Sequence, residues 1–104
     1  MSFNYGDMMK QAKMMQKKMQ KVQQELKEME FEASAGGGAV KARVNGEQEV
    51  LQVKIDRDMV EDSDLDMVED MVMVAINDAI SQSKKETQAR MAEITGGLNI
   101  PGMF

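Results

Sequence analysis

The sequence contains no cysteine and no histidine among its 104 residues. These absences exclude disulfides, cysteine nucleophiles, Ser-His and Cys-His catalytic pairs, and zinc sites built on thiolate or imidazole. Aromatic residues are scarce, with one Tyr, three Phe and no Trp against 13 Met. This inventory favours adaptable packing of methionine in a core or interface over a ligand pocket walled by aromatic rings.

Long apolar stretches are also absent. Residues 1–30 contain no apolar segment of the kind that directs secretion, and the longest unbroken apolar run is Met71–Ile76. We therefore expect a cytoplasmic protein without a membrane-spanning segment. A chain of this length forms one ordinary domain and buries only about two-thirds of its unfolded surface, so a subunit interface would help to stabilise it.

The net charge of −5 argues against nucleic acid as a partner, but the charges are unevenly distributed. Residues 8–24 hold no acid and five lysines, which are Lys10, Lys13, Lys17, Lys18 and Lys21. Residues 57–72 hold seven acids and a single base, Arg57. A third, mildly basic region contains Lys84, Lys85 and Arg90. Exposed charges are screened beyond roughly 8 Å at physiological salt, so a binding surface is expected at residues 8–24 whatever the net charge.

Helix-forming residues fill the segment from about Gly6 to Glu30, which predicts one long helix. Apolar residues recur in it at alternating spacings of three and four, the heptad pattern of a helix that packs along one seam. The seam consists of Tyr5, Met8, Ala12, Met15, Met19, Val22, Leu26 and Met29. From Met8 onward we predict that it forms the interface of a homodimer; packing against the protein's own sheet is the alternative.

The middle of the chain alternates between apolar and polar residues, as half-buried strands do. Strands are predicted at Phe31–Ala35, at Val40–Val44 and at Leu51–Ile55, and the Asn45-Gly46 pair predicts a type I′ turn between the last two. The pattern indicates a three-stranded antiparallel sheet. Its outer face should carry Lys41, Arg43, Gln52 and Lys54.

A second helix is predicted from near Ser63 to about Ile94. The stretch Ser63-Asp64-Leu65-Asp66 resembles a capping box, and apolar residues then follow at helical spacing. The expected fold is α+β in the order α-β-β-β-α, with a single domain over residues 1–95 and a flexible tail over residues 96–104.

The five lysines of residues 8–24 lie mostly opposite the seam, so a helix that pairs through one face can present ammonium groups on the other. Such a ladder of charges suits the phosphates of nucleic acid, and a solvated helix face is the alternative. The ladder contains no arginine, so it would position a duplex rather than read its bases. Lys84, Lys85 and Arg90 form a second predicted contact patch.

No site for a metal or a cofactor is predicted. Asp62, Asp64 and Asp66 imitate the start of a calcium-binding loop, but Met67 stands where glycine is needed and Met73 where glutamate is needed. The glycines at 36–38 lack the spacing of a phosphate-binding loop. Nothing places two perturbed carboxylates, or a buried lysine, in an enclosed site, so we expect neither enzymatic activity nor a small-molecule substrate.

Several segments, taken together and in order, resemble the YbaB/EbfC family of bacterial nucleoid-associated proteins. They are the Met/Gln/Lys-rich stretch Met8–Lys21, the hairpin Gly38–Gly46, the segments Val53–Asp56, Leu65–Val72 and Ala75–Ala79, and the ending Gly97–Phe104. The resemblance implies a small cytosolic homodimer that binds double-stranded DNA and associates with the nucleoid. One departure is Arg57, where members often have proline, and it affects only the lead into the second helix.

Two hypotheses for function follow. The first is a dimeric DNA-binding, nucleoid-associated protein that contacts phosphates through its lysine-rich helices. The second is a chaperone-like protein of the prefoldin type, because a coiled-coil arm joined to a β-hairpin is also how such holders are built. The second hypothesis requires Met8, Met9, Met14 and Met15 to be free, whereas the first expects them to be buried and the lysines to be exposed.

Overall fold

A computed structural model describes residues 5–95, and the tail predicted at 96–104 lies outside this range. The elements are α1 (Tyr5–Glu28), β1 (Glu30–Ala35), the glycine turn η1 (Gly36–Gly38), β2 (Val40–Asn45), β3 (Val50–Ile55) and α2 (Leu65–Thr95). This is the α-β-β-β-α order that the sequence predicts. The strands form one antiparallel sheet in the order β1-β2-β3.

The core lies between α2 and one face of the sheet. Val40, Ala42 and Val44 alternate along β2 with polar residues, and all three are buried against Ala75 and Ala79 of α2. Small alanines on α2 allow the helix to approach the sheet closely, so two layers suffice to bury this apolar face.

Strand β3 has little cover from α2, which packs mainly on β1 and β2. Val53 and Ile55 pair with Ala42 and Val40 and therefore belong to the core-facing side of the sheet. They nevertheless remain 38% and 40% exposed. An apolar edge strand of this kind is a surface that proteins normally cover.

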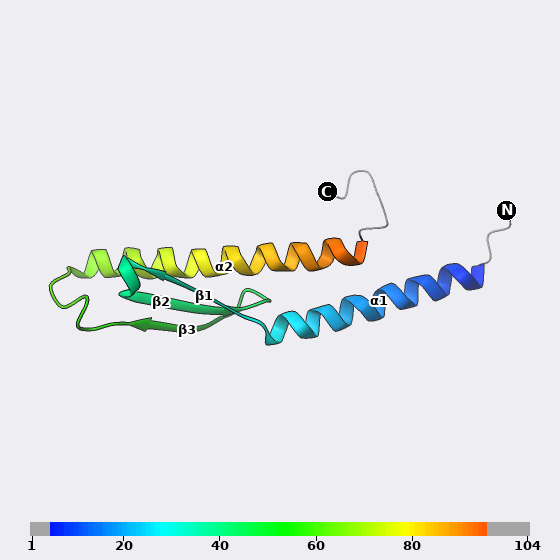
Figure 1. Cartoon of the computed structure of the whole chain (residues 1–104), viewed down its shortest axis with the longest axis horizontal. Coiled ribbons are helices and arrows are strands. Elements are labelled where there is room, and N and C mark those ends of the chain that lie inside the picture. Colours follow the sequence, from blue (N-terminus) through cyan, green and yellow to red (C-terminus); the bar gives the residue numbers. More distant parts are fainter. Residues whose placement is uncertain (1–4, 96–104) are drawn as a thin grey trace.

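Helix α1 projects away from the sheet as an arm (Figure 1). The described chain measures 73 × 25 × 16 Å and has a radius of gyration of 20.0 Å, whereas a compact domain of this size has about 13 Å. In Figure 1 the N-terminal part of α1 extends beyond the C-terminal end of α2. The N-terminal part of the seam therefore does not cover the chain's own sheet.

The predicted type I′ turn at Asn45-Gly46 is wrong. The positive φ falls on Gln48 (62°) and not on Gly46, while the backbone N–H of Gln48 donates to the Asn45 carbonyl at 3.2 Å. The loop is therefore a turn closed by a left-handed residue, which is the usual geometry of three-residue hairpin loops. The Asn45 side-chain oxygen stabilises it by accepting from the N–H groups of Glu47 at 2.9 Å and Glu49 at 3.0 Å.

The start of α2 also differs from the capping box predicted at Ser63. Asp64 is the capping residue, because its side-chain oxygen accepts from the N–H of Met67 at 2.8 Å. Its carbonyl accepts the N–H of Val68 at 3.2 Å. Serine and aspartate serve equally well as caps, so two adjacent candidates shift a predicted start by one residue.

Candidate nucleic-acid interface

The apolar seam of α1 is buried only where the helix joins the body. Leu26 is 3% exposed, whereas Met8 is 52% and Met19 37% exposed. Ala12 is exposed as well, and Met15, Val22 and Met29 are half-buried. Of the seven residues predicted at a dimer interface, Leu26 is thus already covered by its own chain, and the N-terminal members have no cover within residues 5–95.

The arm is attached through the hairpin loop. The N–H of Gly46 donates to the Leu26 carbonyl at 2.8 Å, in the last turn of α1, where this carbonyl also accepts the N–H of Met29 at 3.2 Å. A Cβ atom on Gly46 would lie 2.7 Å from the Cβ and carbonyl carbon of Leu26, so only glycine allows this approach.

The same loop is anchored to α2 by buried polar groups. The fully buried Ser83 donates its hydroxyl to the Asn45 carbonyl at 2.7 Å, and Thr87 donates to the Gly46 carbonyl at 2.9 Å. Gln48 donates to both the Gly46 carbonyl (2.8 Å) and the Ser83 hydroxyl (3.0 Å). Because these groups satisfy one another, α1, the loop and α2 meet at a defined junction.

Arg90 ties the arm to α2 from the other side. Its Nε donates to Glu86 at 2.9 Å, and its guanidinium lies 3.3 Å from Glu25 on α1. The hydrogen bond to Glu86 and the neighbouring carboxylates raise the pKa of Arg90, so the guanidinium stays charged. Arg90 belongs to the second predicted contact patch, and helical spacing already places Glu86 beside it. The pairing with Glu25 on the other helix is the part of this network that the sequence pattern does not reveal.

The five lysines of the arm are exposed along the projecting helix: Lys10, Lys13, Lys17, Lys18 and Lys21. None of them forms a salt bridge with any residue in the described range 5–95. Lys84 and Lys85 are exposed on the C-terminal half of α2. The arm therefore offers a row of uncompensated ammonium groups, and the second predicted patch combines two exposed lysines with the ion-paired Arg90.

Charge is separated along the long axis of the molecule. The acidic start of α2 and the N-terminus of α1 lie at opposite ends in Figure 1, along an axis of 73 Å. This length is many times the screening distance of about 8 Å at physiological salt. The acids therefore do not cancel the positive potential of the arm, despite the net charge of −5.

The profile of the YbaB/EbfC DNA-binding family matches residues 1–98. The chain belongs to this family. A nucleoid-associated protein of Clostridium novyi is 50% identical over 101 residues, covering 97% of this chain and 89% of that protein. A nucleoid-associated protein of Thermoanaerobacter pseudethanolicus is 45% identical over 102 residues, covering 98% and 92% of the two chains.

The fold of this YbaB/EbfC member is shared with a solved structure. An uncharacterised protein from Helicobacter pylori superposes with a TM-score of 0.78 at 19% sequence identity, covering 89% of this chain and 98% of that one. At this identity the likeness establishes the fold alone.

Neither a metal centre nor a membrane-spanning helix is found in the part of the chain that the structure describes. No three His, Cys, Asp or Glu side chains of residues 5–95 converge as metal ligands do. No helix in this range is long and apolar enough to span a bilayer. The family matches give no support to the prefoldin-type alternative.

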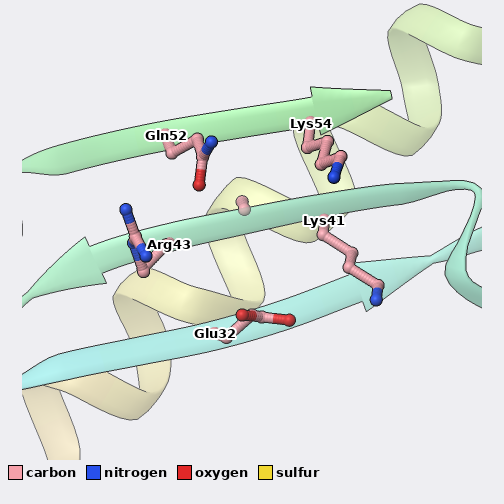
Figure 2. A pocket seen from close by; sticks show the side chains of 6 residues that line it. Glu32, Lys41, Arg43, Gln52 and Lys54 are labelled. Carbon is pink, nitrogen blue, oxygen red and sulfur yellow. The ribbon is translucent and has the colours of Figure 1, made fainter. Parts of the chain in front are cut away.

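The outer face of the sheet carries further cations, as the strand pattern predicts. Figure 2 shows Lys41 and Arg43 of β2 on the same face as Gln52 and Lys54 of β3, with Glu32 of β1 beside them. Sequence spacing placed these strand residues together but missed Arg57, which follows β3 and lines a hollow with Lys41 and Lys54. Only the bend of the chain after Ile55 brings it there.

Proposed function

We propose that this member of a DNA-binding family is a cytoplasmic, nucleoid-associated protein that holds duplex DNA by its phosphate backbone, with the lysines of the α1 arm as the principal contacts. The observation that carries the proposal is the projecting helix with exposed, unpaired lysines on an otherwise acidic chain. Phosphate contacts made by lysine give affinity and orientation and carry little base information. We therefore expect binding with weak sequence preference and a strong dependence on salt.

We further propose that the functional form is a homodimer. The seam of α1 and the apolar side of β3 are both uncovered in the single chain, and the seam residues Met8 and Met19 are 52% and 37% exposed. A second copy is a partner that would supply matching apolar surfaces, and two-fold symmetry would give it two lysine-bearing arms. Two arms double the number of ammonium groups that can reach one duplex.

The seam can be tested with two neighbouring methionines. Met15 lies on the seam, whereas Met14, its neighbour in the sequence, lies off it. Met15→Asp should raise the dimer dissociation constant by about 100-fold or more, because each subunit would bury an unpaired carboxylate. Met14→Asp introduces the same charge and should leave association nearly unchanged. Sedimentation at micromolar concentration measures both; equal association of the two variants would rule out the seam as the interface.

The DNA-binding function and the chaperone-like alternative give opposite results with the unaltered chain. We expect it to bind unrelated duplexes with similar affinity at low salt and to release them as salt rises. We expect no suppression of aggregation when a denatured client protein is diluted into it. Client holding without duplex binding at moderate salt would reject the proposed function.

A further inference from the structure

We propose that the outer face of the sheet is a second phosphate-binding surface, separate from the α1 arm, with Lys41 and Lys54 at its centre. The inference rests on the proposed function for its ligand, which we take to be the phosphodiester backbone of DNA. It assigns a role to residues of the strands, which lie outside both helices.

The two lysines lie directly opposite each other on adjacent strands. The β2–β3 register pairs Lys41 with Lys54 and Arg43 with Gln52. Side chains opposite each other in an antiparallel pair have Cβ atoms about 5 Å apart, and like charges at this position are destabilising. An anion that both side chains can reach would relieve this repulsion, so the pairing of two lysines favours an anionic ligand.

The chain itself does little to neutralise these cations. Among residues 5–95, no salt bridge or hydrogen bond links Lys41, Lys54 or Arg57 to another side chain. The Asp56 carboxylate is engaged by the backbone N–H groups of Asp58 (3.1 Å) and Met59 (3.2 Å). Glu32 and Asp56 are the acids that line the two hollows with these cations.

Arg43 adds an unsatisfied donor to the same surface. Its Nε is buried and has no hydrogen-bond acceptor in the described range, and the nearest carboxylate, of Glu30, lies 3.8 Å away. Buried donors are rarely left without an acceptor, and an arginine donor is well suited to a phosphate oxygen. The Arg43 side chain as a whole is 39% exposed, so this residue adds a third cation to the face that carries the lysine pair.

The shape of the surface suits phosphate groups on a polymer. Two adjoining shallow hollows of about 240 and 380 Å³ lie along the strands, and both are lined by Lys41 and Lys54. Figure 2 shows the first hollow, with donors from β2 and β3 around it. No aromatic side chain lines either hollow, so the surface offers no platform on which a base could stack. These donors can therefore contact the phosphate backbone of DNA.

The test measures duplex binding, and the rise in unfolding temperature caused by free pyrophosphate, on the full chain and on Lys41→Gln/Lys54→Gln. We expect pyrophosphate to stabilise the unaltered chain more than the double variant. We expect the double variant to flatten the dependence of log K on log salt by about one, because one phosphate contact is lost. If the two proteins bind equally at 1 M salt, the variant then binds the duplex about tenfold more weakly than the unaltered chain at 0.1 M. The loss should be equal on unrelated sequences. Lys41→Arg/Lys54→Arg keeps both charges and should keep binding close to that of the unaltered chain.

A charge-matched control separates a local contact from the general effect of removing a cation. The hydrogen bond from Asn45 is the main cause that lowers the pKa of Glu49, and the nearby Lys27 contributes to it. Lys27 lines neither hollow. Lys27→Gln should therefore change the salt slope less than Lys54→Gln does. Removing Lys41 and Lys54 also relieves repulsion, so the double variant should unfold at a temperature equal to or above that of the unaltered chain.

Each outcome decides the inference. Wild-type affinity and slope in Lys41→Gln/Lys54→Gln, on a duplex that the unaltered chain binds, together with unchanged stabilisation by pyrophosphate, would overturn the sheet surface and leave the proposed function standing. Loss of thermal stabilisation by pyrophosphate without any loss of duplex binding would overturn the DNA backbone as the ligand. Failure of the unaltered chain to bind any duplex would instead reject the proposed function, and this inference with it.

Discussion

Replacing Gly46 with alanine should lower the free energy of unfolding by about 2–4 kcal/mol, the range expected when an added atom overlaps rigid neighbours. The new Cβ would lie 2.7 Å from the Cβ and carbonyl carbon of Leu26. The backbone at residue 46 cannot move away without breaking the 2.8 Å hydrogen bond from the Gly46 N–H to the Leu26 carbonyl. The end of α1 would have to leave the hairpin loop, and Leu26 would lose its cover.

Thermal unfolding measures this effect as a lower midpoint, by roughly 4–8 °C per kcal/mol for a domain of this size. The matched control is Gly37→Asn, because Gly37 has a φ of 69° and open space around its Cβ position. Asparagine tolerates this left-handed conformation, so the control should change stability far less. A midpoint in Gly46→Ala as high as that of the control would show that the loop does not hold the arm.

Much of the fold could be predicted because local pattern and final structure agree. The alternation of Val40, Ala42 and Val44 matches the buried face of β2. The long segment rich in helix-forming residues is α1. What the sequence could not reveal depends on contacts between distant segments. Gly46 looks like a turn glycine, yet it is required by the approach of Leu26, twenty positions earlier in the chain.

In the candidate site, too, features set by local sequence pattern could be predicted, whereas contacts between distant segments could not. The exposed lysines of the arm follow from helical periodicity, since they lie mostly opposite an apolar seam. Arg90 looks like one more surface cation, but its partner Glu25 belongs to the other helix. Pairing across 65 positions has no local signature, and neither does the place of Arg57 beside Lys41 and Lys54.

Changing Lys10, Lys13 and Lys17 to glutamine should produce the largest loss of DNA binding of any single set of surface substitutions. Glutamine has a helix propensity close to that of lysine, so α1 should be preserved. If all three lysines contact phosphates, the salt slope becomes shallower by about two to three, and binding at 0.1 M salt weakens by about 100-fold or more. Arginine at the same three positions keeps the charges and should keep the affinity.

The salt dependence of duplex binding tests the central claim most directly. A dimer presents two arms, and if about five of its arm lysines reach phosphates at once, log K should fall with log salt with a slope near −4 to −5. Measured side by side on two unrelated duplexes, the unaltered chain should show this slope and Lys10→Gln/Lys13→Gln/Lys17→Gln a shallower one, alike for both sequences. A triple variant with wild-type affinity and slope would contradict the claim that the α1 arm holds the DNA.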